Sequence, residues 1–170
     1  HPDGAVIIVT GAGSGIGQAT AVLAARHGYR VAGWDINPEG MARTIAAAGP
    51  DGGRITAIAG NVTDRAAIAE GMAASAALGP LVGLVNNAGV NDGVGLENGS
   101  YEAFMASLHK NVVHYYLMAH HALPALKETK GSIVNIGSKT AETGQGGTSA
   151  YAAANGGRNA LTREWAVELL

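Results

Sequence analysis

Short apolar runs alternate along this chain with longer segments in which small and apolar residues recur at helical spacing. The first run, residues 5–10, passes directly into glycines and then into a helix that should end at Gly28. The remaining strands are predicted at residues 30–35, 54–60, 81–85 and 131–137, and the remaining helices at residues 38–48, 64–77, 100–128 and from residue 149 onward. Strand and helix therefore alternate throughout, and Pro124 is expected to bend or end the helix that contains it.

The predicted strands are apolar along almost their whole length, which is typical of strands that are buried on both faces. We therefore expect an α/β protein with a doubly wound parallel sheet and helices on each side. A length of 170 residues, of which 47% are hydrophobic and 14% charged, suits one domain with a substantial core, residues 1–170. The glycine-rich segment 142–149 is the longest loop predicted to be mobile.

The charges and the absent residue types narrow the function classes. The formal net charge is −2 and the basic residues are scattered, so no nucleic-acid partner is indicated. The sequence has no cysteine, which excludes disulfides, a thiolate nucleophile and zinc thiolates within it. No apolar run approaches membrane-spanning length and no signal-peptide pattern opens the sequence, so we expect a cytoplasmic protein without a membrane partner.

The segment TGAGSGIG, residues 10–17, lies where the first strand gives way to the first helix. Glycines there allow a sharp turn and a close approach to a ligand, and the helix N-terminus offers free N–H groups and a partial positive charge to a pyrophosphate. A loop of this kind in this position is typical of a dinucleotide-binding Rossmann fold. The loop residues that we assign to the cofactor are Gly11, Ser14, Gly15, Ile16 and Gly17.

An acidic residue at the end of the second strand indicates which dinucleotide binds. Asp35 follows Gly17 by 18 residues. A carboxylate at this place can accept hydrogen bonds from both hydroxyls of an adenine ribose, and it would repel a 2′-phosphate. The predicted cofactor is therefore NAD rather than NADP. The competing interpretation is a tight turn followed by an ordinary aspartate at a strand end.

Several motifs follow one another in a fixed order: TGAGSGIG at residues 10–17, GNVTD at residues 60–64, NNAG at residues 86–89, and the single residues Asn111, Ser138 and Tyr151. Together they resemble the motifs of the short-chain dehydrogenases/reductases, and the resemblance extends over essentially the whole chain. It implies an enzyme that needs no metal and transfers a hydride between a nicotinamide cofactor and a small-molecule substrate, at the hydroxyl or carbonyl group of a secondary alcohol or sugar.

The resemblance also assigns residues to the adenosine half of the cofactor. The NNAG motif, with Asn87, Ala88 and Gly89, would steady the sheet beside it. Asn61 and Val62 would flank the adenine ring, although the family more often has aspartate at the first of these positions. An amide can still hydrogen-bond the edge of adenine, so the substitution leaves this assignment in place.

Three residues carry the chemistry that the resemblance implies. Tyr151 would be the acid/base, Ser138 would hydrogen-bond the substrate oxygen, and Asn111 would anchor a water that relays protons. Taken one by one, they also suit a half-buried packing tyrosine, a serine that caps a loop, and an asparagine that bonds to a helix carbonyl. Ser138 directly follows the fifth strand and Tyr151 lies 13 residues later, a combination that favours the catalytic interpretation.

Asn155 departs from the family pattern, which has a lysine four residues after the tyrosine. One helical turn brings the two side chains to the same face, where the lysine charge favours tyrosinate and the ammonium binds the nicotinamide ribose. A free phenol has a pKa of about 10, and a cation about 5 Å away contributes roughly 3 kcal/mol at an effective dielectric constant near 20, or about two pKa units. The Asn155 amide supplies no such charge, though it could still hold a ribose hydroxyl.

Two nearby cations are candidates to replace the lysine. Lys139 adjoins Ser138, and Arg158 lies about one further turn along the helix from Asn155, but both also suit an ordinary position on the surface. The predicted enzyme therefore binds its cofactor and has a slow or alkaline-shifted chemical step, which an N155K variant should correct. The alternative is a NAD-binding protein that has lost its chemistry and acts as a sensor or scaffold.

The last helical segment predicts how copies of the chain associate. Residues 156–170 are rich in small and apolar side chains that suit close helix packing, and in the family this helix and the one around Asn111 form the usual dimer interface. We therefore expect a homo-oligomer, either a dimer or a tetramer. The family normally continues with two more strands and a segment over the substrate, so the chain is expected to be truncated at its C-terminus, with the fifth strand left as an exposed edge.

The remaining patterns bear on the substrate and on metals. The segment YAAANGGRNALTREWAVEL, from residue 151, resembles that of sugar-oxidising members such as L-fucose dehydrogenases. A nucleotide-sugar epimerase on a related fold would need a larger C-terminal domain. His109, His114, His120 and His121 invite a metal site, but no carboxylate stands at a matching spacing, so packing or surface histidines are the preferred interpretation.

Overall fold

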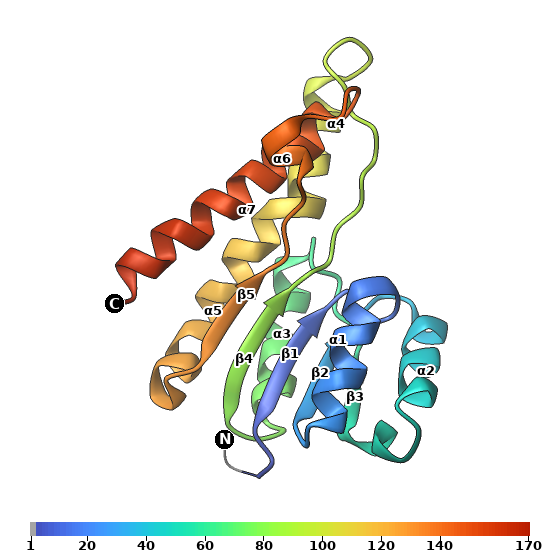
Figure 1. Cartoon of the computed structure of the whole chain (residues 1–170), viewed down its shortest axis with the longest axis vertical. Coiled ribbons are helices and arrows are strands. Elements are labelled where there is room, and N and C mark those ends of the chain that lie inside the picture. Colours follow the sequence, from blue (N-terminus) through green and yellow to red (C-terminus); the bar gives the residue numbers. More distant parts are fainter. Residues whose placement is uncertain (1–2) are drawn as a thin grey trace. The chain divides into compact units, whose positions relative to one another are not determined.

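The computed structural model describes residues 3–170 and contains a parallel sheet with the strand order β3-β2-β1-β4-β5 (Figure 1). Helices cover both faces of this sheet, so the predicted doubly wound α/β fold is confirmed. The strands are β1 (Val6–Thr10), β2 (Arg30–Trp34), β3 (Ile55–Ile58), β4 (Leu81–Asn86) and β5 (Ser132–Asn135).

Two of the helices on the sheet begin directly after residues whose side chains cap them. Asn37 accepts the N–H groups of the first turn of α2, and Asp64 does the same for α3. None of the helices in the described part of the chain is both long and apolar enough to span a membrane. The elements are α1 (Gly15–Arg26), α2 (Pro38–Ala47), the 3-10 helix η1 (Gly49–Arg54), α3 (Arg65–Ala76), α4 (Tyr101–Leu108), the π-helical turn η2 (His109–Val113), α5 (His114–Thr129), α6 (Thr140–Thr143) and α7 (Ser149–Glu168).

The chain forms two compact units, each described by itself. The first unit runs to Ala88 and includes residues 117–134, and the second contains residues 89–116 and 135–170. The first unit holds the sheet with the helices that cover it, and the second holds α4, η2, α6 and α7. A single domain over residues 1–170 stays a prediction.

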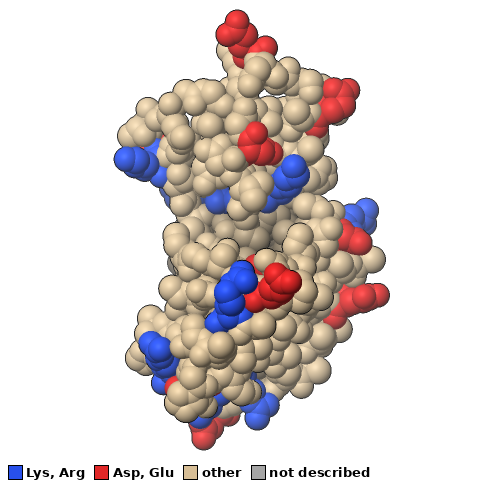
Figure 2. All heavy atoms as spheres, turned by 90° about the vertical axis from the view of Figure 1, so that its right-hand side faces the viewer, with Lys and Arg blue, Asp and Glu red and all other residues tan. Residues whose placement is uncertain are grey.

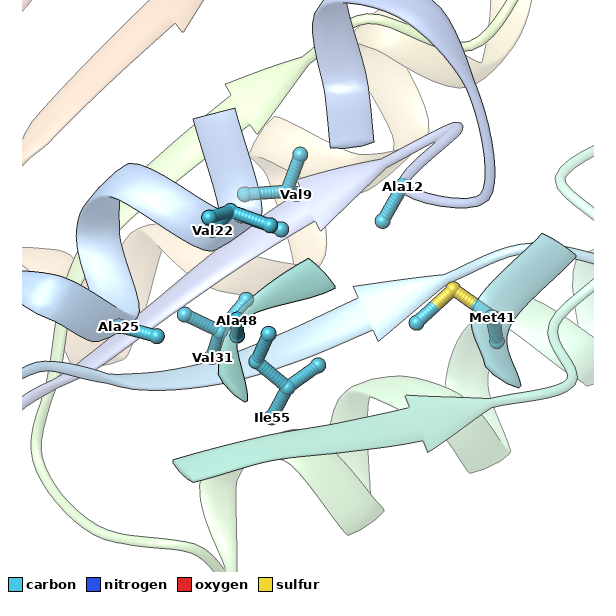
Figure 3. Packing of buried hydrophobic residues seen from close by; sticks show 9 residues of the cluster. Val9, Ala12, Val22, Ala25, Val31, Met41, Ala48 and Ile55 are labelled. Atoms are coloured by element: carbon cyan, nitrogen blue, oxygen red, sulfur yellow. The ribbon is translucent and has the colours of Figure 1, made fainter. Parts of the chain in front are cut away.

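One face of the sheet in the first unit is sealed by small and branched apolar side chains. Period-two alternation turns Val31 of β2 toward this face, where it lies with Val9 of β1 and Ile55 of β3 under α1 and α2 (Figure 3). The burial of these side chains stabilises the unit by the hydrophobic effect. The buried members of the cluster are Val9, Ala12, Ala21, Val22, Ala25, Val31, Met41, Ala48 and Ile55.

The opposite face is built around Trp34, which is 1% exposed at the end of β2. The indole Nε1–H donates to Ser75 Oγ of α3 at 3.0 Å, so the ring is buried without losing its hydrogen bond. Cβ atoms added to Gly60 and Gly71 would lie 2.6 and 2.5 Å from atoms of the indole ring. These glycines therefore provide the space that the ring occupies between the sheet and α3.

The predicted helix over residues 100–128 is interrupted by η2. Two side chains bond to backbone carbonyls in or next to this widened turn: Asn111 Nδ2 donates to the Ser107 carbonyl at 3.1 Å, and His114 Nε2 lies 2.8 Å from the Lys110 carbonyl. Pro124 was expected to bend or end this helix, and the structure shows that the helix does not end there. Proline has no N–H group, so one helix carbonyl lacks its usual partner. Because Pro124 is exposed, water can donate to that carbonyl, and α5 continues to Thr129.

The two edge strands differ from the expectation of burial on both faces. Thr56 and Ala57 of β3 are exposed, as are Ser132 and Val134 of β5. Both strands are also shorter than predicted, because the pairing that defines them ends before the flanking glycines. The β5 strand forms one edge of the sheet in the described residues, as expected for the fifth strand.

Charged side chains are interspersed on the face drawn in Figure 2, where basic and acidic groups alternate without a large area of one sign. Ion pairs within residues 3–170 include Arg54 with Asp51 at 3.7 Å and Lys110 with Asp92 at 3.9 Å, all on exposed or half-buried side chains. Exposed pairs of this kind contribute little to stability.

Candidate active site

The glycine-rich loop after β1 is held by the loop after β4, in the first unit. Asn87 Nδ2 donates to the Thr10 carbonyl at 3.1 Å, and the N–H groups of Asn87 and Ala88 donate to Thr10 Oγ1 at 2.9 and 3.0 Å. A Cβ atom on Gly17 would overlap the carbonyl oxygen of Gly11 and lie 2.7 Å from Asn87 Nδ2. The loop after β4 thus fixes the shape of the predicted phosphate loop, and its closeness to an adenosine stays a prediction.

The N-terminus of α1 presents backbone donors. Ser14 precedes the helix without its side chain accepting a hydrogen bond from the first turn, and helical bonding begins with the Gln18 N–H, which donates to the Ser14 carbonyl at 3.1 Å. The N–H groups of Gly15, Ile16 and Gly17 have no partner within such a helix. Ser14, Gly15 and Ile16 are exposed, so an anion can approach these donors.

The Asp35 carboxylate is fixed beside this loop at the end of β2. Its Oδ2 accepts the Gly13 N–H at 2.9 Å, and its Oδ1 accepts the Asn37 N–H at 2.9 Å. A Cβ atom on Gly13 would lie 2.7 Å from Asp35 Oδ2, so loop and carboxylate fit together only with glycine at this position. Each carboxylate oxygen keeps acceptor capacity for a further donor.

Asn61 and Val62 follow β3 at the edge of the sheet where Asp35 follows β2. Asn61 is exposed, and its Oδ1 accepts both the N–H and the hydroxyl of Thr63, at 2.9 and 2.7 Å. Because this oxygen closes a local turn, the amide nitrogen is the group that can donate a hydrogen bond to an acceptor on an adenine ring. The half-buried Val62 offers an apolar surface beside it. Contact of either residue with adenine stays a prediction.

In the second unit, Asn111 is fully buried in η2 and links three segments. Its Oδ1 accepts the Val90 N–H at 2.8 Å, and its Nδ2 donates to the carbonyls of Val90 at 2.8 Å and Ser107 at 3.1 Å. Its backbone carbonyl accepts Arg158 Nε at 2.6 Å. Through these bonds Asn111 holds the three segments together within the second unit. Its role in anchoring a water stays a prediction.

The interpretation of Arg158 as a surface residue is wrong, because this side chain is only 3% exposed. Besides the bond to the Asn111 carbonyl, Nη1 donates to the Ile136 carbonyl at 3.3 Å and to Asn155 Oδ1 at 3.0 Å. The guanidinium carbon lies 4.2 Å from the centroid of the Tyr115 ring, a cation–π contact. The planar fork of an arginine allows these contacts at once, which draws the side chain inward.

Asn155 is fully buried, and both ends of its amide are used inside the second unit. Its Nδ2 donates to the Tyr151 carbonyl at 2.9 Å, and its Oδ1 accepts from Arg158. In the structure the Asn155 amide accepts from the Arg158 guanidinium, and a contact between this amide and a ribose hydroxyl stays a prediction.

Tyr151 and Ser138 are both half-buried in the second unit, in the first turn of α7 and shortly after β5. Ser138 Oγ donates to Thr140 Oγ1 at 3.1 Å and accepts the Thr140 N–H at 3.2 Å, so it does close a turn. Two residues before it, the Ile136 carbonyl accepts from Arg158 and from the Tyr115 hydroxyl, the latter at 3.0 Å. Arg158 thereby connects the segments that carry Asn111, Ser138 and Tyr151.

Gly89 lies against this group at the start of the second unit. A Cβ atom there would lie 2.6 Å from Arg158 Nη2 and 2.7 Å from Asn111 Oδ1. Any side chain at this position would displace one of these two groups. The glycine that the NNAG motif contributes is thus required by Arg158 and Asn111, a reason that differs from the predicted one.

Burial changes the titration of the two aromatic residues beside Arg158. It lowers the pKa of His114 to about 4, an effect that the Lys110 carbonyl partly opposes and the Arg158 charge reinforces. It raises the pKa of Tyr115 to about 12, with the Arg158 charge opposing. Burial also lowers the pKa of Arg158, while Tyr115 and Tyr151 oppose that change. Arg158 therefore keeps its charge among neutral neighbours near neutral pH.

The other candidates from the sequence lie on the surface. Lys139, His109, His120 and His121 are exposed, and the rings of the last two meet edge to face with centroids 5.7 Å apart. Among residues 3–170 no group of three or more histidine and carboxylate side chains is arranged to hold a metal ion.

Comparison with known proteins agrees with this geometry. The family description "short chain dehydrogenase" matches residues 5–170. The chain belongs to the short-chain dehydrogenase family. It is 34% identical to the 3-oxoacyl-[acyl-carrier-protein] reductase FabG of Thermotoga maritima over 98% of its own length and 69% of that protein's.

Solved structures of this short-chain dehydrogenase's relatives superpose closely. An actinorhodin polyketide ketoreductase with NADPH has a TM-score of 0.90 at 28% identity, and a carveol dehydrogenase from Mycobacterium avium in complex with NAD has a TM-score of 0.90 at 27% identity. Each comparison covers 98% of this chain and 66% of the other. The chain thus spans about two thirds of the length of the relatives described, of which the ketoreductase structure holds NADPH and the carveol dehydrogenase structure holds NAD.

The residues of this short-chain dehydrogenase fit a nicotinamide dinucleotide. Unpaired N–H groups at an exposed helix N-terminus suit a pyrophosphate, and the carboxylate of Asp35 suits a pair of ribose hydroxyls. A Cβ atom at position 17 would overlap the Gly11 carbonyl oxygen, so the observed shape of the loop requires glycine there.

From the sequence, Arg158 was one of two nearby candidates to replace the lysine, and its burial among Asn111, Tyr115 and Asn155 was not predicted. A signal was present, because Tyr151, Asn155 and Arg158 are spaced i, i+4 and i+7 and therefore share one helix face. Tyr115 was missed altogether, since a tyrosine within an apolar helix gives no sign of the carbonyl that its hydroxyl meets.

Proposed function

We propose that this short-chain dehydrogenase is an NAD-dependent oxidoreductase acting on a hydroxyl or carbonyl group of a small molecule. The observation that carries the proposal is the Asp35 carboxylate, held by two backbone N–H groups beside the phosphate loop. A fixed negative charge at this position favours the ribose diol of NAD and disfavours the 2′-phosphate of NADP.

In the proposed reaction the bound nicotinamide accepts or supplies a hydride, and the chain supplies the proton chemistry. The Tyr151 hydroxyl exchanges a proton with the substrate oxygen, and Ser138 Oγ hydrogen-bonds that oxygen. The half-buried position of both side chains supports these roles, since each is open to a ligand on one side. The turn between Ser138 and Thr140 keeps the serine hydroxyl in a defined orientation.

The substrate that we propose is a secondary alcohol or a sugar, oxidised at one hydroxyl or formed by reduction of the ketone. The support is the resemblance of residues 151–169 to sugar-oxidising members of the family. A homo-oligomer, either a dimer or a tetramer, and a cytoplasmic location complete the proposal.

Cofactor binding provides the first test. Titrations of intrinsic fluorescence with NADH and NADPH should give a dissociation constant at least about tenfold lower for NADH, or about 1.4 kcal/mol. Asp35→Asn keeps the shape of the side chain and removes its charge, so it should reduce the ratio of the NADPH and NADH dissociation constants. The control Asp51→Asn, in η1, should leave this ratio unchanged. Equal affinity of the native protein for both dinucleotides would exclude the assignment to NAD.

Turnover separates the enzyme from a NAD-binding sensor or scaffold, which is the second candidate. The inward-facing amide of Asn155, where the family has lysine, is the observation that favours this second candidate. NADH formation with a panel of polyols and secondary alcohols should be measurable and should fall at least about 100-fold in Tyr151→Phe. Tight NADH binding without turnover of any compound would favour the sensor.

A further inference from the structure

Two hydrogen bonds in a row lead from Ser138 to the glycine-rich loop of the second unit. Ser138 Oγ donates to Thr140 Oγ1 at 3.1 Å, and Thr140 Oγ1 donates to Gln145 Oε1 at 3.2 Å. A hydroxyl group has one hydrogen, so the Thr140 hydrogen that goes to Gln145 is not available to Ser138. The partner of the Gln145 amide therefore decides in which direction the bond between the two hydroxyls runs.

Gln145 is the member of this row that a ligand can reach most readily. Thr140 is only 7% exposed, whereas Gln145 is exposed and Ser138 is half-buried. Within residues 3–170 the Gln145 side chain has no hydrogen-bond partner besides Thr140. One lone pair of Oε1 and both amide hydrogens are therefore left for a ligand.

The loop that carries Gln145 is open at the positions next to it. Gly144, Gly146 and Gly147 have φ angles of 70°, 89° and 68°, a backbone region that favours glycine. Cβ atoms added to these glycines would have no atom within 4 Å. The glycines thus serve the conformation of the backbone, and no neighbouring segment covers the loop at these three positions.

The distance between the two ends of the row suits two oxygens of one small molecule. Ser138 Oγ and Gln145 Oε1 both lie within hydrogen-bond distance of Thr140 Oγ1, so they are no more than about 6.3 Å apart. Hydrogen bonds of about 3 Å from each end can meet hydroxyls on neighbouring carbon atoms. A ligand with a single hydroxyl can bond to only one end at a time.

We propose that Gln145 is a specificity-determining residue that selects a hydroxyl on the carbon next to the reacting one, so that the substrate is a vicinal diol, a polyol or a sugar. The second hydroxyl of the substrate donates to Gln145 Oε1 in competition with Thr140. The Thr140 hydrogen then turns to Ser138 Oγ, which leaves the Ser138 hydrogen for the reacting oxygen. Thr140 is thus a positioning residue that acts through Ser138.

The consequence for catalysis rests on the proposed function, which makes Ser138 the partner of the reacting oxygen. The binding of a vicinal diol between Ser138 and Gln145 does not itself require turnover. Because Gln145 is exposed, water can replace a missing second hydroxyl, so the preference for a diol should be that of about one hydrogen bond.

The first test compares matched substrates of the full chain with NAD. The value of kcat/KM should be at least about fivefold higher for propylene glycol than for isopropanol, and for vicinal cyclohexanediol than for cyclohexanol. Gln145→Met keeps the length of the side chain and removes the amide, so this preference should disappear. Gln145→Glu keeps an acceptor oxygen and should retain most of it. Glu142→Met, at an exposed position of α6, should leave the preference as in the native protein.

The role of Thr140 is tested by separating kcat from KM. Thr140→Val should lower kcat for the diol toward that for the single alcohol, while the ratio of their KM values stays as in the native protein. Thr140→Ser keeps the hydroxyl and should restore kcat. Equal kcat/KM for both members of each pair in the native protein, or a preference that persists in Gln145→Met, would overturn the selection by Gln145. A kcat for the diol in Thr140→Val equal to the native value would overturn the positioning role.

A binding measurement distinguishes failure of this inference from failure of the proposed function. The side-chain amide signal of Gln145 in the magnetic resonance spectrum of the isotope-labelled chain with NAD is identified by its absence in Gln145→Glu. Vicinal cyclohexanediol should shift this signal and cyclohexanol should not. If no compound is turned over and only the diol shifts the signal, the proposed function fails and the selection by Gln145 stands. If neither compound shifts the signal, or both shift it equally, the selection by Gln145 is overturned whatever the turnover.

Discussion

At the scale of single residues, the hydrogen bond between Asn155 and Arg158 reverses the expected effect of restoring the family's lysine. Asn155→Lys would place an ammonium where the amide oxygen accepts from Arg158 Nη1 at 3.0 Å. Two buried cations would then face each other, and the guanidinium would lose an acceptor.

We therefore expect Asn155→Lys alone to lower the free energy of unfolding by about 2 kcal/mol or more, instead of improving activity at neutral pH. Urea denaturation provides the measurement. Ala160→Lys adds the same charge at an exposed position of α7 and should change the stability by less than about 0.5 kcal/mol. An Asn155→Lys protein as stable as the native one would contradict this account.

The individual site residues were predictable to different degrees. The Asp35 position followed from its distance along the chain to the glycine loop, because strand, loop and helix lengths in this fold determine where a strand ends. The burial of Arg158 could not be predicted in the same way. Helical spacing shows that Arg158 lies on the same helix face as Tyr151 and Asn155, but it does not show which other segment packs on that face. For the same reason, the hydrogen bond that Asn155 Oδ1 accepts from Arg158 was not predicted.

At the scale of elements, two helical glycines should respond in opposite ways to alanine. A Cβ atom on Gly71 of α3 would lie 2.5 Å from the Trp34 ring, whereas one on Gly156 of α7 would have no atom within 4 Å. Alanine is the better helix former by about 1 kcal/mol, and only the first glycine has a packing reason to be kept.

Gly71→Ala should therefore lower the free energy of unfolding by about 2 kcal/mol, because the overpacked indole must shift. Gly156→Ala should raise it by about 0.5 kcal/mol or more. Thermal unfolding of both variants measures the difference. Two variants that shift Tm in the same direction would show that the space around Trp34 is not limiting.

Among the elements, the interior strands β1, β2 and β4 agree with prediction to within about one residue at each end, since their apolar runs are bounded by polar or glycine positions. The π-helical turn was not predictable from helical spacing. Side chains of Asn111 and His114 bond to the carbonyls of Ser107 and Lys110 in or next to this turn, and apolar spacing does not register such bonds. The edge strands were predicted too long, because alternation alone does not mark where pairing ends.

At the scale of the whole molecule, the buried His114 makes stability depend on pH. Its pKa is lowered to about 4 in the folded protein, against about 6.5 when unfolded. Between these values the unfolded chain binds more protons than the folded one, so the free energy of unfolding rises with pH. The stability that the neutral imidazole allows is complete above about pH 6.5 and is lost as the pH falls toward 4.

Over this window His114 should account for a loss of about 3 kcal/mol. Denaturation by urea at a series of pH values measures the slope. His114→Gln removes the titrating group and should flatten the slope, whereas His27→Gln, at an exposed position after α1, should leave it as in the native protein. A slope that is the same in native protein and His114→Gln would assign the acid sensitivity to other groups.

The space left by Gly89 beside Arg158 Nη2 also constrains the order in which substitutions can accumulate. A lysine at position 155 is destabilising while position 158 carries its charge, and a side chain at position 89 would meet both the Arg158 guanidinium and the Asn111 amide. The effect of a substitution at position 89, 155 or 158 therefore depends on which residues occupy the other two positions. A chain that carries Asn155 with Arg158 therefore cannot gain a lysine at position 155 by a single substitution without bringing two buried cations together.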